Sequence, residues 1–550
     1  MPAVIGLDFG TESVRALLLE TERGEVVGTA ARAYADGVID HVLPRAEEAL
    51  PPDWALQNPD DWLLCMADAV SAVMTETGYS PEAVVGIGID FTSCTVLPVT
   101  KAGEPLCRIP EWKSDPHSWP KLWKHHAAQP QADRINSMAT AAGEIWLPRY
   151  GGRISSEWLL PKALEILEDS PALYEAADCI LEGADWVVWQ LTGRLARNSC
   201  AAGYKALWHS EDGYPGRQFL TSLDSRLGDL FSQKVSGDIR APGYTVGPLL
   251  PEWGRRMGLA GDVQVASPII DAHAAAIGGG SSRAGDLFMI MGTSTCHMLL
   301  ADEEKPVPGI AGVVRDGIIA GLYGYEAGQA ASGDCLAWLV DNALPASYAR
   351  EAVRAGQSPH EYLSELASTL RPGESGLLAL DWLNGNRSTL VDADLSGLIL
   401  GVTLSTRPEE IYRALIEATA YGTRVIVDAF ESAGLGIQNI RAGGTLASNS
   451  VVAQIYADVL GQEVLVVDSP EVSARGAAVL GSAAAGLFQS VSEAAEHLGT
   501  RIARTFVPRT EARVTYDEIF KEYLELYDYF GRGRNPVMKS LRRLRRIQES

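Results

Sequence analysis

The stretch from Ile5 to Leu19 reads Ile-Gly-Leu-Asp-Phe-Gly-Thr-Glu-Ser-Val-Arg-Ala-Leu-Leu-Leu. Two apolar runs of strand length flank a polar segment that contains Gly10, a pattern typical of a β-hairpin. Glycine lets backbone N–H groups approach a phosphate closely, and the hydroxyls of Thr11 and Ser13 add donors. Asp8 is a hard oxygen ligand suited to Mg²⁺. An ordinary polar hairpin tip has the same pattern, so this stretch alone leaves both interpretations open.

A second stretch, from Leu287 to Leu300, repeats this layout. Gly292-Thr293 matches Gly10-Thr11, and strand-like runs flank both pairs, which indicates an internal duplication. The copy lacks the acid, because Ile290 stands where Asp8 stands in the first stretch. Two related hairpins, one of them with a carboxylate, predict two facing domains that hold one polyphosphate between them.

The composition is that of a large globular protein. The 550 residues are too many for one core, so we expect two large domains. No apolar run approaches the ~20 residues that span a bilayer, and the N-terminus enters a strand without a basic leader, so we expect no membrane segment and no signal peptide. The seven cysteines are scattered and form no C-x-x-C pair, which indicates a reducing cytoplasm. The net charge of −24 disfavours nucleic-acid binding.

Several single residues are candidates for a site. Asp271 is expected to begin a short Ala-rich helix, either as a plain N-cap or as a proton acceptor, and the helix dipole should keep its carboxylate ionised in both cases. Lys205 follows a Gly-containing turn and lies between aromatic residues. Glu326 is expected at the polar end of a strand over 318–325, where it binds sugar hydroxyls or is solvated. Gly443-Gly444 joins a short strand to a helix, as nucleotide-binding loops do.

Periodicity and capping signals predict the surrounding elements. Asn58 and Pro59 open a helix, and Pro171 to Thr192 is expected as one helical region. Thr406-Arg407-Pro408-Glu409 predicts a capping box that opens a helix to about Phe430.

The segment from Lys539 to Arg546 carries five basic residues, for which we favour a solvated helix over pairing with the acidic body or a partner subunit. P-loop, dinucleotide, zincin and nucleophile-elbow motifs are absent from the sequence.

Together these blocks resemble the FGGY carbohydrate kinases, members of the actin/hexokinase/Hsp70 superfamily. The resemblance covers nearly the whole chain and rests on Asp8 to Arg15, Asp271 to Gly280, Gly292 to Thr295 and Gly443 to Asn449. It implies an α/β fold of two RNase H-like domains with a cleft between them. The implied divisions are an N-terminal domain over 1–268, a C-terminal domain over 269–505 and a helical extension over 506–550.

Within that family the chain looks most like the members that act on L-ribulose. It shares with them the segments Asp90 to Ser93, Gly203 to Ala206 and Tyr325 to Gly328. At Ser93-Cys94 it differs from glycerol kinases, which have an Arg-Glu pair there, and from xylulokinases, which have a Met-His pair. The resemblance therefore implies a cytoplasmic homodimer that phosphorylates the C5 hydroxyl of L-ribulose with Mg²⁺ and ATP, in L-arabinose catabolism. Kinases of D-ribulose, ribitol or xylulose remain alternatives, as does a non-catalytic, actin-like nucleotide switch.

The resemblance also implies roles for individual residues. Asp271 would be the general base, and Asp8 and Asp271 would hold Mg²⁺, Asp8 through water. The implied sugar site is Ser93, Trp123, Lys205, Asp271 and Glu326. The implied ATP site comprises Gly10, Thr11, Ser13, Arg15, Gly292, Thr293 and Ser294 for the phosphates, and Gly333, Gly444, Ser448 and Asn449 for adenosine. Small molecules are the expected partners, with no nucleic acid and no membrane.

Overall fold

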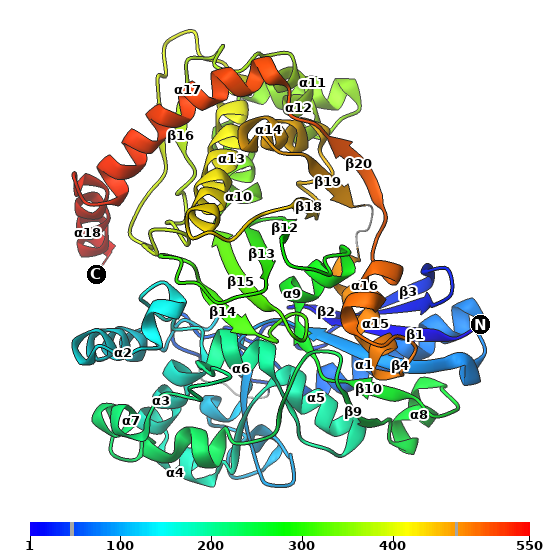
Figure 1. Ribbon diagram of the computed structural model, residues 1–550. Helices are drawn as coiled ribbons and strands as arrows, with labels where there is room; N and C mark the ends of the chain where they lie inside the picture. Colours follow the sequence, from blue (N-terminus) through cyan, green and yellow to red (C-terminus); the bar gives the residue numbers. More distant parts are fainter. Residues whose placement is uncertain (45–48, 468–470, 550) are drawn as a thin grey trace.

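The computed structural model describes residues 1–44, 49–467 and 471–549. In these ranges the chain forms two seven-stranded sheets, each flanked by helices (Figure 1). The first sheet has the order β3-β2-β1-β4-β10-β9, with β11 beside β4; its strands are β1 (Ala3–Phe9), β2 (Ser13–Glu20), β3 (Glu25–Ala33), β4 (Val84–Phe91), β9 (Thr245–Pro248), β10 (Gln264–Ala266) and β11 (Ile269–Ile270). The second sheet has the order β14-β15-β13-β12-β18-β19-β20; its strands are β12 (Asp286–Met291), β13 (Thr295–Ala301), β14 (Gly312–Arg315), β15 (Tyr323–Gln329), β18 (Asn439–Gly443), β19 (Val464–Val467) and β20 (Ile502–Phe506).

The two sheets repeat one topology, so the sequence duplication is a structural one. β1 pairs antiparallel with β2 and parallel with β4. In the same way, β12 pairs antiparallel with β13 and parallel with β18. The predicted hairpins are therefore the β1–β2 and β12–β13 turns, and the predicted α/β fold with two related domains is confirmed.

The first sheet is covered on both faces because its side chains alternate in direction. Ile5 and Leu7 pack against α1 (Pro59–Thr77), whereas Val4 packs on the opposite side against α15 (Val472–Ala484). The α1 helix begins as predicted, because the Asn58 side chain accepts a hydrogen bond from the N–H of Asp60. Further helices near this sheet are α5 (Gly183–Thr192), α8 (Pro251–Met257) and α16 (Val491–Leu498).

Helix α15 and α9 (Asp271–Gly278) lie where the two halves of the molecule meet (Figure 1). Their packing is so close that a Cβ on Gly6 of β1 would lie 1.9 Å from the carbonyl oxygen of Ala474. A Cβ on Gly476 would likewise lie 1.9 Å from the carbonyl oxygen of Ala274 in α9. Glycine is therefore required here for backbone-to-backbone contact, and a helix from the second half of the chain completes the core of the first.

The outer face of the second sheet packs on the long helix α13 (Pro408–Ser432). The predicted helix is confirmed, but the predicted capping residues are wrong. The Glu410 carboxylate accepts from the N–H of Arg407 at 2.7 Å, whereas the Thr406 hydroxyl accepts from Thr403. Neighbouring helices are α10 (Gly333–Ala343), α11 (Ala346–Ala355), α12 (Pro359–Ser368), α14 (Ser450–Leu460), α17 (Thr510–Leu526) and α18 (Val537–Glu549).

The predicted helical region over 171–192 is interrupted by a strand. Ile180 and Leu181 are buried in β6 (Cys179–Glu182), which pairs with β5 (Val96–Val99). Sheet pairing therefore overrides the local helical pattern between two shorter helices. Remaining elements are α2 (Gln129–Ala142), α3 (Leu159–Asp169), α4 (Pro171–Ala176), α6 (Ser199–Ala206), α7 (Arg217–Leu223), β7 (Arg197–Asn198), β8 (Ile239–Arg240), β16 (Leu378–Leu380) and β17 (Leu398–Leu400). Among the described residues, no helix combines the length and the apolar character needed to cross a membrane.

Candidate active site

A cavity of about 370 Å³ lies between the two halves of the molecule. Side chains from both duplicated units line it, so each unit contributes one wall. The predicted site residues that line it are Asp8, Ser93, Trp123, Lys205, Asp271, Gly292, Thr293, Ser294 and Glu326. The structure thus brings all five predicted sugar-site residues and one predicted phosphate hairpin into a single space.

The first hairpin adjoins this cavity, although Gly10, Thr11, Ser13 and Arg15 do not line it. The indole N–H of Trp123 donates to the Thr11 hydroxyl at 3.1 Å. The Arg15 guanidinium lies 3.7 Å from the Asp8 carboxylate, and the N–H of Gly10 donates to the carbonyl of Ser13 at 2.9 Å. The β1–β2 turn is therefore linked directly to the cavity wall.

Two glycine turns of the second half converge on the end of β12. The N–H of Gly333 donates to the carbonyl of Gly292 at 3.0 Å. A Cβ on Gly444 would lie 2.5 Å from the carbonyl oxygen of Met291. These contacts make a backbone-lined floor beside the second hairpin, which is the kind of surface that a nucleotide can approach closely.

Ser448 and Asn449 are predicted residues whose side chains make local hydrogen bonds. The Ser448 hydroxyl donates to the carbonyl of Thr445 at 2.7 Å. The Asn449 amide oxygen accepts from the N–H of Val451 and caps α14, while its amide nitrogen donates to Ser364 at 2.8 Å. The Asn449 amide is therefore already engaged in structural contacts.

Three carboxyl groups gather at the ends of parallel strands of the first sheet, where ligands bind in open α/β sheets. Asp8 and Asp90 are register partners on β1 and β4, and Asp271 begins α9 directly after β11. Burial raises the pKa of Asp8, and burial together with the charge of Asp8 raises that of Asp90. Both Asp90 oxygens are buried without a hydrogen-bond partner. Asp90 was not predicted as a site residue; its signal was its position at the end of a buried strand, as for Asp8.

Asp271 has an unusual environment for an aspartate. Burial raises its pKa to about 7, and the charge of Asp8 adds to this effect. The N–H of Ala272 donates to the carboxylate at 2.6 Å and acts in the opposite direction. The expectation that the helix dipole keeps this group ionised is wrong, because desolvation outweighs the dipole at this buried end. A carboxyl group with a pKa near neutrality can take up and release a proton during turnover.

The end of the cavity at which the sugar is predicted to bind contains a buried ion pair. The Lys205 ammonium lies 2.8 and 3.1 Å from the two Glu326 oxygens. Lys205 belongs to α6 and does not follow a turn, and Glu326 lies inside β15 because that strand begins at Tyr323. Burial opposes ionisation of Glu326, but the charges of Lys205 and Arg387 outweigh it and lower its pKa to about 2. The alternative of a solvated Glu326 is therefore wrong.

Sequence reasoning missed two residues at this end. The Arg387 guanidinium donates to Glu326, and the His273 ring lies 3.5 Å from the same carboxylate. Burial lowers the pKa of His273 to about 3, so the ring is neutral at physiological pH. Arg387 lies in a segment without helical or strand periodicity. Apart from the isolated arginine itself, that segment has no pattern that would indicate a site. His273 shares the first turn of α9 with Asp271, which was the available clue.

The carboxylates fit a magnesium ion that shares its coordination with a substrate. Among the described residues, no three His, Cys, Asp or Glu side chains are arranged to hold a metal by themselves. Mg²⁺ usually keeps several waters and binds one or two carboxylates together with substrate phosphates. Asp8 and Asp271 line the cavity and offer two such groups.

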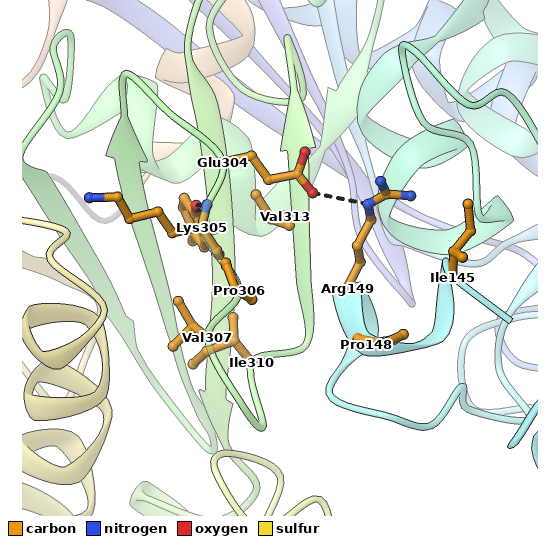
Figure 2. A pocket seen from close by; sticks show the side chains of 10 residues that line it. Ile145, Pro148, Arg149, Glu304, Lys305, Pro306, Val307, Ile310 and Val313 are labelled. Carbon is orange, nitrogen blue, oxygen red and sulfur yellow. Dashed lines mark hydrogen bonds and ion pairs between the residues drawn. The ribbon is translucent and has the colours of Figure 1, made fainter. Parts of the chain in front are cut away.

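A second cavity, of about 300 Å³, lies on the opposite face of β15 from the first. Figure 2 shows side chains that line it. None of the predicted site residues lines it. Tyr325 lines this cavity while its neighbour Glu326 lines the first, because successive side chains of a strand point to opposite faces. At its edge, Arg149 donates to Glu304 at 2.9 Å and so connects two distant parts of the chain (Figure 2).

Comparison with known families agrees with this architecture. The model of the FGGY family of carbohydrate kinases, N-terminal domain, matches residues 3–278, and that of its C-terminal domain matches residues 287–485. The chain belongs to the FGGY family of carbohydrate kinases. The predicted family is thereby confirmed, and the cavity of about 370 Å³ lies between segments matched by the two models.

Curated relatives of this FGGY kinase match it over nearly their full length. The ribulokinase of Anoxybacillus flavithermus is 50% identical over 544 residues, which cover 98% of this chain and 96% of the relative. The ribulokinase of Halalkalibacterium halodurans is 50% identical over 549 residues, covering 99% and 98%. Among solved structures, xylulose kinase from Rhodospirillum rubrum aligns with a TM-score of 0.78 at 22% identity, covering 96% of this chain and 98% of that one. This last likeness shows the shared fold.

Proposed function

We propose that this FGGY kinase transfers the γ-phosphoryl group of ATP to the C5 hydroxyl of L-ribulose. The substrate is supported by the identity of about 50% to relatives named ribulokinase. The observation that carries the chemistry is Asp271, a carboxyl group with a pKa of about 7 that shares one cavity with the Lys205–Glu326 pair and the second hairpin.

The Lys205–Glu326 pair is suited to holding sugar hydroxyls. The ammonium donates hydrogen bonds, and the carboxylate accepts them while it stays ionised, because its pKa is about 2. Ser93 and Trp123 line the same cavity and would bound the sugar on the side of the first sheet. These groups orient the substrate so that its terminal hydroxyl points to Asp271.

Asp271 then accepts the proton of that hydroxyl as the hydroxyl oxygen attacks the γ-phosphorus, while the bond from the γ-phosphorus to the β,γ-bridging oxygen breaks and ADP leaves. The residues that would surround the phosphates are Gly10, Thr11, Ser13 and Arg15 of the first hairpin and Gly292, Thr293 and Ser294 of the second. Asp8, through water, and Asp271 would hold Mg²⁺, which supplies positive charge beside the β- and γ-phosphates when bound. Positioning and charge stabilisation provide most of the acceleration in phosphoryl transfer.

The remaining assignments complete the proposal. Adenosine would lie against Gly333, Gly444, Ser448 and Asn449, next to the second hairpin. The chain would divide into domains over 1–268 and 269–505 and an extension over 506–550. We further propose a cytoplasmic homodimer, for which light scattering of the purified enzyme should give twice the chain mass.

An ADP-release assay with a panel of sugars tests the function. The panel contains L-ribulose, D-ribulose, ribitol, xylulose and a sugar-free control, and L-ribulose should give the highest kcat/KM. A higher value for another member would identify a different sugar specificity. Failure of every sugar to stimulate ATP turnover would favour a nucleotide switch instead, although such a switch has no need of a buried Lys205–Glu326 pocket.

A further inference from the structure

The connection between β16 and β17, residues 381–397, reaches the sugar end of the cavity. β16 and β17 pair antiparallel, with Leu380 opposite Leu398. Loops between paired antiparallel strands usually have about two to five residues, so this one is long and needs contacts with other elements to keep one conformation. We call residues 381–397 the arginine loop, because Arg387 lies at its cavity side.

Arg387 gives Glu326 a second cationic partner. Its guanidinium donates to Oε1 of Glu326, which also accepts from Lys205 at 3.1 Å, and it lies 3.8 Å from the sulfur of Cys296. Two cations around one ionised carboxylate leave a net positive charge at the sugar end, while Asp8 and Asp271 lie at the reactive end. Arg387 thus fixes the orientation of the carboxylate that would accept sugar hydroxyls.

The arginine loop is only partly held by its own hydrogen bonds. Asn386 and Asp392 exchange backbone hydrogen bonds of 2.9 and 2.8 Å, and the Asn386 side chain accepts from the N–H of Leu390. Ser388 accepts from the N–H of Gly328 in β15 at 3.2 Å. The Asn386–Asp392 pair closes the tip of the loop around Arg387, and the Ser388 contact ties this tip to the second sheet.

The C-terminal extension, residues 506–550, holds the other side of this loop. The Tyr527 hydroxyl lies 3.0 Å from the Thr389 hydroxyl, two residues from Arg387. The Tyr527 ring also meets the Trp382 ring edge-on, with a centroid distance of 5.3 Å. One aromatic side chain of the extension therefore contacts the loop before and after Arg387.

Helix α18 adds charged contacts to the far end of the arginine loop. Lys539 forms an ion pair with Asp392. The Arg542 guanidinium donates to the carbonyls of Ala393 and Leu395. The favoured prediction of a solvated basic helix is therefore wrong for these two residues, and the alternative of pairing with the acidic body holds. Figure 1 shows α17 and α18 along the outer flank of the upper half of the molecule.

We propose that the C-terminal extension positions the arginine loop, so that Tyr527, Lys539 and Arg542 control sugar affinity by holding Arg387 against Glu326. This inference rests on the proposed assignment of the Lys205–Glu326 pocket to the sugar. Tyr527, Lys539 and Arg542 are positioning residues, because none of them lines the catalytic cavity. Arg387 is the residue that meets the substrate pocket directly.

Steady-state kinetics of full-length variants tests the proposal. K539A/R542A should raise the KM for the sugar by roughly tenfold, the scale of losing one charge-assisted hydrogen bond, and leave the KM for ATP unchanged. The matched control is Arg534→Ala, which removes a basic residue of the same extension that pairs with Glu525. This control should match the wild type in both constants. Equal increases in both KM values for the double variant would overturn the proposal.

A mutant cycle separates positioning from a general loss of structure. Arg387→Ala should raise the KM for the sugar by ~10-fold or more, and Arg387→Lys should restore part of the loss. Once Arg387 is absent, adding K539A/R542A should change the KM little, because the loop then has no side chain to position. Additive effects in the triple variant would contradict the inference.

The same experiments distinguish this inference from the proposed substrate. If another sugar of the panel is preferred, the L-ribulose assignment fails, and the cycle measured with that sugar still supports or contradicts the role of the extension. If no sugar is turned over, the proposed function fails. Amide exchange over 384–395 then decides: faster exchange in K539A/R542A than in wild type supports positioning, and equal exchange overturns it.

Discussion

Asp8 on β1 lies opposite Arg15 on β2, whereas at the equivalent register of the second hairpin Ile290 lies opposite Cys296. In both turns the glycine N–H donates to a serine carbonyl at 2.9 Å, but the acceptor lies three residues on in the first turn (Ser13) and two residues on in the second (Ser294). The two hairpins thus share a turn closed by a glycine N–H, but only the first carries a charged pair, Asp8 and Arg15. In the proposed mechanism the second hairpin would hold phosphate with neutral donors, while the first would also supply Asp8 to the magnesium ion.

The two hairpins also differ in what they contact. The first is bonded through Thr11 to Trp123 in the wall of the sugar pocket. In the second, the Thr295 hydroxyl donates to Ser332 at 2.8 Å, beside the Gly333 turn. If the proposed sites are right, the first hairpin supports sugar binding and the second supports nucleotide binding, and variants at equivalent positions should affect different kinetic constants.

The largest expected effect concerns Asp271, which lines the cavity that both hairpins adjoin. Asp271→Asn removes the proton acceptor and should lower kcat by ~10²-fold or more, as is usual for loss of a general base. Steady-state turnover with saturating sugar and ATP measures it. The variant should melt at or above the wild-type temperature, because it removes a buried carboxyl group whose ionised form is disfavoured by desolvation. Near-normal turnover would refute the assignment of the base.

The charge difference between the hairpins predicts a different response to magnesium. Asp8→Asn should raise the Mg²⁺ concentration for half-maximal activity by ~10- to 100-fold, the scale for a group that binds a metal through water. Ile290→Val, the matched change at the equivalent register, should leave that concentration unchanged. A magnesium titration of both variants at fixed ATP makes the comparison. Equal shifts would mean that the hairpins contribute alike.

The pH profile reports the protonation of Asp271 in the free enzyme. Its pKa of about 7 lies above the ordinary aspartate value, so the group is protonated and inactive as a base at lower pH. We expect kcat/KM for the sugar to fall roughly tenfold per pH unit below neutrality. Glu326, with a pKa of about 2, does not titrate in this range. A flat profile from about pH 5 to about pH 8 would contradict the expected burial effect.

The smallest effects should come from the two hydroxyl contacts. Trp123→Phe removes the donor to Thr11 and should raise the KM for the sugar by ~2- to 10-fold, the net value of one hydrogen bond. Thr295→Val removes the equivalent support of the second hairpin and should raise the KM for ATP by a similar factor. Both KM values are measured for each variant. If Trp123→Phe changed only the KM for ATP, the proposed division, in which the first hairpin supports sugar binding and the second supports ATP binding, would be wrong.

Much of the fold and part of the cavity could be predicted because their signals are local. The hairpins are visible as glycine turns between apolar runs, and Asp271 is visible as the start of an Ala-rich helix. The Lys205–Glu326 pair joins residues 121 positions apart, and Arg387 reaches Glu326 across 61 positions, so neither contact has a sequence period. The strand β6 was missed because its burial comes from pairing with β5. The titration of Asp271 was missed because desolvation depends on what surrounds a helix end.

The close packing of α15 on β1 also has a consequence for biosynthesis. A ribosome completes β1 within the first residues of the chain, but the helix that covers its inner face is made only after residue 471. Gly6 leaves no side chain to shield that face in the meantime. The face of the first sheet that packs on α15 therefore stays uncovered until almost the whole polypeptide has been synthesised. A translation arrest before α15 would release a fragment with an exposed apolar surface.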